Sequence, residues 1–388
     1  MTDRVPFLSS RLQGFGTTIF ADMSALAERT GSINLGQGFP DTDGPDEVLE
    51  AAIAAIRAGH NQYPPGIGVP ALRHAIAAHQ RRFYDLAYDA DTEILVTAGA
   101  TEAIAASLLA LCETGDEVVT FEPYYDSYAA SIAMAGAVRR VVQLRPPDYA
   151  FDPDDLVAAI TPRTRLILLN SPHNPTGKVF TRAELEQIAT LARDHDLIVV
   201  TDEVYEHLVF DATHVPIATL PGMRERTVAI SSGGKTFSFT GWKVGWVCAV
   251  PALVTAVRTA KQFLTYVSSG PFQHAIAVGL ALPDEYYRRI ATDLRVKRDV
   301  VVTGLRDAGF DVFEPSGTFF VTTDIRRLGE TDGLAFCRSL PDRCGVVAIP
   351  NVVFYDDVES GAPFIRFTFC KRLEVLEEAM TRLKVLAP

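Results

Sequence analysis

Ser231-Ser232-Gly233-Gly234-Lys235-Thr236-Phe237 follows directly after the apolar, β-branched run Thr227-Val228-Ala229-Ile230. The two glycines let the backbone around Lys235 bend closely about a ligand, because glycine has no Cβ. Other polar groups that come after apolar runs or lie within them are Asn174 in Asn174-Pro175-Thr176-Gly177, Asp202 in Asp202-Glu203-Val204-Tyr205, Lys243 and Arg366. The lysine turn therefore predicts an α/β fold whose functional site lies where buried strands end.

Apolar runs of strand length alternate with helical patterns through the middle of the chain. The strand candidates cover residues 94–97, 117–121, 165–170, 197–200 and 227–230. Thr181-Arg182-Ala183-Glu184 predicts a capping box that opens a helix reaching about His195. Near-continuous apolar strands between helices predict a large domain with a mainly parallel sheet, covered by helices on both faces.

A change of pattern after residue 285 predicts a smaller α+β domain. Helical patterns cover 295–307 and 373–386, and short strand candidates cover 319–321, 346–349 and 364–369. The segment up to about Pro40 is expected to be an extended arm and loop. We therefore expect an arm and part of the small domain at 1–45, a large domain at 46–285 and a small C-terminal domain at 286–388.

Composition excludes several classes of protein. The 388 residues carry a formal net charge of -12, which gives no support for nucleic-acid binding. No apolar run approaches the ~18 residues of a membrane span, and residues 1–10 contain no apolar core of a signal peptide. Five cysteines without a C-x-x-C pair are typical of buried thiols in a reducing compartment. The sequence thus predicts a cytoplasmic protein that binds neither membranes nor nucleic acid.

Gly234-Lys235-Thr236 also resembles the end of a nucleotide-binding P-loop. The complete motif needs a glycine six positions before the lysine. That position is Ala229, in the middle of a strand candidate. The nucleotide-binding interpretation therefore fails.

The residue types match those that hold pyridoxal 5'-phosphate (PLP) and an amino acid. Lys235 can form a Schiff base with the PLP aldehyde. Asp202 follows a buried strand candidate and needs a cationic partner, which a protonated pyridine nitrogen would supply; a helix N-cap is its alternative role. Arg366 lies in an apolar strand candidate, where a substrate carboxylate or an internal salt bridge would pair with it.

Other residues fit the same cofactor less specifically. Asn174 and Tyr205 can bond the phenolic oxygen of PLP, and Tyr124 can stack on its ring. Plain turn chemistry for Asn174 and core packing for the two tyrosines are the alternatives. The Gly99-Ala100-Thr101 turn can offer backbone N–H groups to the phosphate, joined by Ser232 and Lys243.

Several motifs resemble the class I aminotransferases of PLP-dependent fold type I, over nearly the whole chain. Those shared with the kynurenine/glutamine and methionine aminotransferase subgroup are Asn34–Pro40, Asn61–Pro64, Asn170–Gly177 and Thr236–Lys243. The segments Phe20–Leu26 and Thr368–Arg372 resemble actinobacterial N-succinyldiaminopimelate aminotransferases.

The resemblance implies a role for each candidate residue in a homodimer with shared active sites. Lys235 would be the Schiff-base lysine and proton shuttle, with Asp202 on the pyridine nitrogen. Contacts to O3' are implied for Asn174 and Tyr205, and ring stacking for Tyr124. The phosphate would be held by Ala100, Thr101, Ser232 and Lys243, with Tyr63 from the other subunit. The substrate α-carboxylate would be held by Gly38, Asn174 and Arg366. Lys243 stands where many aspartate-type relatives carry arginine, so the charge is kept but the bidentate fork is lost.

The expected reaction is amino transfer from N-succinyl-L,L-diaminopimelate to 2-oxoglutarate. A broad-range glutamine/kynurenine/methionine aminotransferase and a cysteine-conjugate β-lyase remain alternatives. A PLP-binding sensor with a DNA-binding module is disfavoured by the acidic charge. The donor pocket would be cationic or amide-lined for a succinylated donor and apolar for an aromatic or thioether donor. Its candidate wall residues are Phe15, Phe20, Tyr125 and Tyr128.

Overall fold

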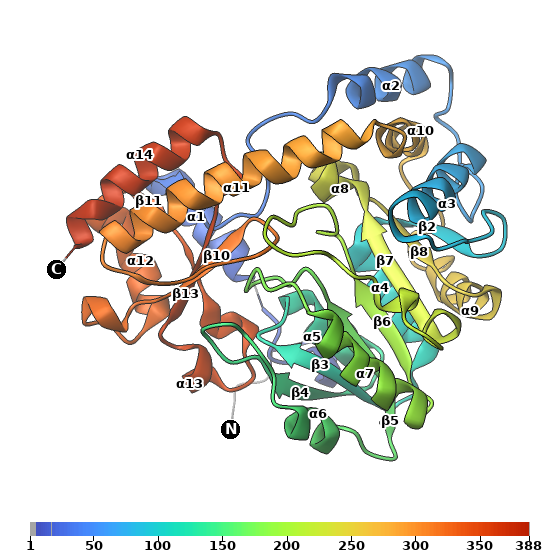
Figure 1. The fold of residues 1–388 in the computed structure, drawn as a ribbon, viewed down its shortest axis with the longest axis horizontal. Helices are drawn as coiled ribbons and strands as arrows, with labels where there is room; N and C mark the ends of the chain where they lie inside the picture. The colour runs from blue at the N-terminus through green and yellow to red at the C-terminus, as the bar shows by residue number, and fades with distance from the viewer. Residues whose placement is uncertain (1–4, 17, 388) are drawn as a thin grey trace.

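The computed structural model describes residues 5–16 and 18–387. Its largest sheet contains β2 (Ile94–Ala98), β3 (Glu117–Glu122), β4 (Val138–Gln143), β5 (Thr164–Asn170), β6 (Ile198–Asp202), β7 (Thr227–Ser232) and β8 (Val244–Cys248). The order across the sheet is β2-β8-β7-β6-β5-β3-β4. Only β8 runs antiparallel to its neighbours, and the other pairings are parallel. The predicted mainly parallel sheet is therefore confirmed (Figure 1).

Helices cover this sheet on both faces, because successive side chains of a strand point to opposite sides. In β5, Leu166 and Leu168 pack with α4, α5 and α9, whereas Ile167 and Leu169 pack toward α6 and α7. The helices α2, α3 and α10 pack together beside β2 and β8. These helices are α2 (Asp46–Arg57), α3 (Pro70–Tyr84), α4 (Gly99–Leu111), α5 (Asp126–Met134), α6 (Pro153–Ala159), α7 (Arg182–Asp194), α9 (Pro251–Lys261) and α10 (Gly270–Leu280).

The predicted capping box at the start of α7 is confirmed. The Thr181 side chain accepts a hydrogen bond from the backbone N–H of Glu184 at 3.2 Å. The Glu184 carboxylate accepts one in return from the backbone N–H of Thr181 at 2.8 Å. These reciprocal bonds satisfy two N–H groups that a helix N-terminus otherwise leaves free.

The smaller α+β part contains a four-stranded antiparallel sheet in the order β12-β13-β10-β9. Its strands are β9 (Asp311–Phe313), β10 (Phe320–Asp324), β12 (Ile349–Pro350) and β13 (Phe364–Thr368). A separate parallel pair joins β1 (Ile33–Asn34) to β11 (Val346–Val347). The helices of this part are α1 (Ile19–Thr30), α11 (Asp284–Asp307), α12 (Gly333–Cys344), α13 (Val358–Gly361) and α14 (Leu373–Leu383). In Figure 1, the long α11 runs from beside α10 to α14 and so spans both parts.

The structure differs from the expected elements at several places. Two strands of the large sheet, β4 and β8, were not among the strand candidates. The segment up to about Pro40 is not only an arm and loop, because α1 begins after its cap Thr18 and packs Met23 and Ala27 into the core with α12 and β11. The expected strand 346–349 is divided at Ala348 between two sheets. The helix expected from residue 295 begins at Asp284.

Two further sequence-based points concern the cysteines and the membrane. All five cysteines are free thiols, and Cys248, Cys337 and Cys370 are buried as packing residues. Across residues 5–16 and 18–387, none of the helices combines the length and apolar composition needed to cross a membrane.

Candidate active site

A cavity of about 800 Å³ lies at the carboxyl ends of β2, β5, β6 and β7 and extends to β13. Its lining includes Lys235, Asp202, Asn174 and Arg366, which lie far apart in the sequence. Because parallel strands end at the same edge of a sheet, the fold brings these groups together. The cavity is therefore the candidate site that the lysine turn predicted.

Lys235 lies in α8 (Gly233–Thr236), the single helical turn that follows β7. Its Nζ donates to the carbonyl oxygen of Gly38 at 3.2 Å. Burial lowers the pKa of Lys235 to about 8, although Cys370 and Asp202 oppose the shift. A lysine with this pKa loses its proton more readily than a solvated one, so it can act as a nucleophile and base near neutral pH.

Asp202 ends β6 and is 5% exposed. One carboxylate oxygen accepts from the Tyr128 hydroxyl at 2.7 Å, and the other accepts from the backbone N–H of Val204 at 3.3 Å. Burial raises the pKa of Asp202 to about 6, and these two hydrogen bonds only partly offset it. Among the described residues no basic side chain forms an ion pair with it. A buried acid of this kind favours a cationic ligand.

Arg366 lies at the centre of β13 and is 1% exposed. Its Nη1 donates to Asn174 Oδ1 at 2.7 Å, and its Nη2 donates to the Gly36 carbonyl at 3.1 Å. The guanidinium also packs over the Phe320 ring at 3.9 Å, while Nε has no partner. The internal salt bridge considered from the sequence does not occur within residues 5–16 and 18–387. The geometry thus leaves the charge available for a carboxylate ligand.

The first turn of α4 forms a cradle with Lys243. Gly99 has φ +75°, and a Cβ there would lie 3.0 Å from Lys243 Cε and 3.1 Å from Nζ. Gly245 lets β8 pack equally closely against the start of α4, since a Cβ added at this position would lie 2.7 Å from Ala100 N. Ala100, Thr101, Ser232 and Lys243 all line the cavity. A helix N-terminus beside an ammonium group is suited to a phosphate.

Asn174, Tyr205 and Gly38 also line the cavity. Two residues with important contacts received no such role from the sequence. Asn170 donates to the Asp202 carbonyl at 2.8 Å and accepts from the Asn174 N–H at 2.7 Å, which ties the loop after β5 to β6. Tyr128, proposed only as a wall residue, is the donor to Asp202. The position of Asn170, a polar side chain at the end of a buried strand, could have indicated its role from the sequence.

Tyr124 and Tyr63 do not line the cavity in this chain. The Tyr124 hydroxyl donates to Asp356, and the Arg139 guanidinium lies 5.1 Å from its ring centroid. The adjacent Tyr125 lines the cavity instead. Tyr63 is 81% exposed and packs edge-on against Tyr266, with ring centroids 5.7 Å apart.

The model of the class I and II aminotransferase family matches residues 30–383. The chain is a class I/II aminotransferase. This aminotransferase is 51% identical to a probable N-succinyldiaminopimelate aminotransferase of Mycobacterium tuberculosis, over 97% of this chain and 98% of that one. It is 41% identical to the methionine aminotransferase of Escherichia coli, with full coverage of both chains.

Solved structures give the same result for the fold. The structure of N-succinyldiaminopimelate aminotransferase from M. tuberculosis superposes with a TM-score of 0.96 at 52% identity, covering 98% of this aminotransferase and 100% of that chain. An E. coli structure with a methionine aminotransferase function has a TM-score of 0.93 at 41% identity, covering 97% and 99%. The PLP-dependent fold type I expected from the sequence is thereby confirmed.

PLP is the cofactor of class I aminotransferases, and the cavity of this aminotransferase fits it. The buried, unpaired Asp202 suits the protonated ring nitrogen. The cradle of Gly99 and Lys243, which a Cβ would crowd, suits the phosphate. The buried amine of Lys235 suits the aldehyde carbon. Each end of the cofactor thus meets a group of complementary charge or reactivity.

Proposed function

We propose that this aminotransferase moves the amino group of N-succinyl-L,L-diaminopimelate to 2-oxoglutarate in the cytosol. The observation that carries this choice of donor is the 51% identity, over nearly both full lengths, to a protein named for that activity. The chemistry itself is supported by the buried Arg366, which can take the carboxylate that both substrates share.

Bound PLP supplies an electron sink that makes the Cα proton of the donor acidic. Arg366, together with Asn174 and Gly38, holds the α-carboxylate and so fixes the direction of the Cα–H bond. Nζ of Lys235 removes the proton from Cα. Its pKa is lowered to about 8, so more of the amine is unprotonated near neutral pH than in a solvated lysine. Asp202 pairs with the protonated ring nitrogen and keeps it charged.

We assign the remaining cofactor contacts from the lining of the cavity. Asn174 and Tyr205 are proposed to bond O3'. The phosphate is assigned to Ala100, Thr101, Ser232 and Lys243. The ring face is assigned to Tyr125, which lines the cavity, in place of Tyr124, which does not. The exposed Tyr63 is proposed to reach the site of a second subunit in a homodimer.

A second candidate function is supported by the composition of the cavity wall. Phe15, Ile19, Phe20 and Val353 give this wall an apolar surface. The basic residues of the described lining are Lys235, Lys243 and Arg366, and each already has a role. An apolar wall favours a thioether or aromatic donor, so a broad-range glutamine/kynurenine/methionine aminotransferase with β-lyase activity is the alternative.

Steady-state kinetics with 2-oxoglutarate as the acceptor test the choice of donor. We expect kcat/KM for N-succinyl-L,L-diaminopimelate to exceed that for methionine, kynurenine or glutamine by at least ~10-fold, as for an enzyme that discriminates its own donor, because this chain is 51% identical to a protein named for that donor. The reverse order would replace the proposal with the broad-range function. Release of pyruvate and ammonia from a cysteine conjugate, without any oxo acid, would show the β-lyase activity.

A further inference from the structure

The segment that carries Asp202 has a second polar face that transamination does not use. Within Asp202–His207, Asp202 and Tyr205 line the cofactor cavity, whereas Glu203, Glu206 and His207 do not. Glu206 and His207 lie beside His79 of α3, and Glu203 contacts His214. This segment therefore connects the cofactor cavity with a separate buried cluster.

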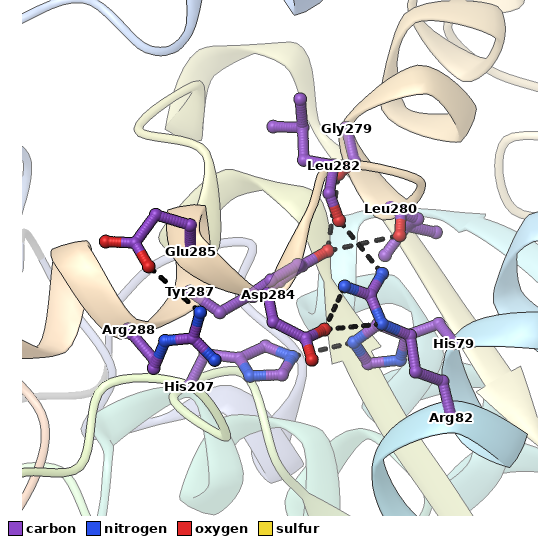
Figure 2. Close-up of polar contacts among 10 residues, drawn as sticks. All are labelled: His79, Arg82, His207, Gly279, Leu280, Leu282, Asp284, Glu285, Tyr287 and Arg288. Atoms are coloured by element: carbon purple, nitrogen blue, oxygen red, sulfur yellow. Dashed lines mark hydrogen bonds and ion pairs between the residues drawn. The ribbon is translucent and has the colours of Figure 1, made fainter.

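His79, Glu206 and His207 form the core of that cluster. Nε2 of His79, on α3, lies 2.6 Å from Nε2 of His207, and Figure 2 shows the two rings side by side. One nitrogen or carboxylate oxygen of each of the three residues lies within 4.8 Å of those of the other two. His79 and Glu206 are 2% and 4% exposed, and His207 is partly buried. No other group of three such ligand residues occurs in the part of the chain that the structure describes.

The cluster leaves polar atoms without partners although it is buried. The Glu206 carboxylate has the Tyr84 side chain as a polar neighbour and accepts from the Ser231 hydroxyl at 2.6 Å through Oε1, but Oε2 has no partner within hydrogen-bond geometry. Nδ1 of His79 also has none. Such atoms are rare inside proteins and destabilise the fold unless an ion or water satisfies them.

The nearby cation does not satisfy the Glu206 carboxylate. Arg82 Nε donates to Asp284 at 2.8 Å, and its Nη1 donates to the Leu282 carbonyl at 2.9 Å. Figure 2 shows this guanidinium turned toward Asp284. On the other side, Glu203 is occupied by His214, whose Nε2 lies 3.2 Å from Oε2. The cluster therefore has donor atoms for a cation but no protein cation directed at them.

We propose that His79, His207 and Glu206 bind one divalent transition-metal ion, with Zn²⁺ as the best match. Two imidazoles and one carboxylate are a common zinc ligand set, and a fourth position remains for water. Two nitrogens at ~2.05 Å from a tetrahedral ion lie ~3.3 Å apart, so the two rings must separate by about 0.7 Å. Binding thus replaces one hydrogen bond with two metal–nitrogen bonds.

The ion acts as a positioning element for the cofactor site. It links α3 to the segment after β6, four and five residues beyond Asp202. Because Glu206 and His207 would be held by the ion, the segment Asp202–His207 moves less, and Asp202 and Tyr205 keep their positions in the cavity. The site stands on its own residues and does not depend on which amino donor the enzyme uses.

Metal analysis of the PLP-loaded, full-length enzyme without a histidine tag tests this site. A chelator removes bound metal, and the protein is then dialysed against Zn²⁺ and freed of excess metal. The zinc content per chain is measured by mass spectrometry. We expect about one Zn²⁺ per wild-type chain and a loss of that ion in His79→Gln and His207→Gln. His274→Gln is the matched control, because His274 also lies in a close histidine pair, with its ring stacked on that of His60 at a centroid distance of 4.1 Å.

Two further readouts separate metal loss from misfolding. Cofactor absorbance per chain should remain in the metal-free variants, and Zn²⁺ should raise the unfolding temperature of the wild type but not of Glu206→Gln. A folded wild-type enzyme that retains no zinc would overturn the proposal. Full zinc content in folded His79→Gln and His207→Gln chains would overturn it as well.

Discussion

The Arg366 guanidinium donates to the side-chain oxygen of Asn174 at 2.7 Å, which joins the centre of β13 to the loop after β5 across the cavity. The two residues come from different parts of the fold and are 192 positions apart. Arg366 is 1% exposed and has no acidic partner in the described residues. The contact orients the fork of Arg366 and leaves its charge for the substrate.

Arg366→Lys should impair binding of both substrates. A lysine keeps the charge but loses the bidentate fork, so we expect kcat/KM to fall about 100-fold, equivalent to ~3 kcal/mol. The loss should appear as a raised KM for the amino acid and for the oxo acid, with cofactor absorbance retained. Arg327→Lys on the surface is the control. Unchanged KM values in Arg366→Lys would contradict the assigned role.

Asp202→Asn should stabilise the cofactor-free enzyme but weaken PLP binding. The pKa of Asp202 is raised to about 6 from 3.8, so the folded chain holds a proton that the unfolded chain has lost between these values. Stability of the wild-type apoenzyme therefore falls by up to about 3 kcal/mol as the pH rises through that window. Asparagine does not titrate, so the variant should lack this decline.

Chemical unfolding of both apoenzymes between pH 4 and pH 7 measures this difference, and titration with PLP measures the affinity. The weaker PLP binding is expected because asparagine cannot neutralise the ring nitrogen. If the two apoenzymes show the same pH dependence, Asp202 is not a buried, unpaired acid.

Gly99→Ala should lower PLP affinity at the phosphate end. The new Cβ would lie 3.0 Å from Lys243 Cε and displace the ammonium from the start of α4. Gly115→Ala is the matched control, because Gly115 also has positive φ (+94°) but has open space around its Cβ position. Both substitutions place alanine at a positive φ, which costs about 1–2 kcal/mol of backbone strain in each variant. Equal PLP affinities for the two variants would rule out the cradle.

Tyr125→Ala and Tyr124→Ala should have different effects. Tyr125 lines the cavity, so its removal should weaken PLP binding by about 10-fold or more through lost stacking. Removal of Tyr124 should lower the unfolding temperature, since Tyr124 is 4% exposed and packs in the core, while PLP affinity of the folded protein stays near that of the wild type. PLP titration and thermal unfolding of both variants decide the assignment. Weakened PLP binding in Tyr124→Ala alone would instead assign the ring face to Tyr124.

The sequence predicted five strands of the large sheet, β2, β3, β5, β6 and β7, because they are almost wholly buried and read as continuous apolar runs. It missed β8 and the edge strand β4, whose side chains are mostly not buried. Residues that follow those strands, such as Asp202 and Lys235, could be placed at one edge for the same reason. Arg366 could be singled out because a charge in an apolar strand is costly without a partner.

Other features depend on tertiary contacts that no local pattern records. Ring stacking was expected of Tyr124 from the sequence, but packing decides which of the adjacent Tyr124 and Tyr125 rings faces the cavity. The division of residues 346–349 at Ala348 follows from pairing with β1 and β13, which lie far away in the chain. The cluster of His79 and His207 joins residues 128 positions apart, so no spacing motif indicates it.

The donor half-reaction tests the central claim most directly. PLP-loaded enzyme is mixed with one amino acid and no oxo acid, and the cofactor absorbance is followed in a stopped-flow instrument, with Lys235→Ala as the control. We predict a rapid spectral change with N-succinyl-L,L-diaminopimelate, a much slower one with methionine or kynurenine, and none with Lys235→Ala. A rapid change with methionine or kynurenine and none with the succinylated donor would contradict the proposed substrate. Absence of cofactor absorbance even after PLP is added would contradict the site built on Lys235.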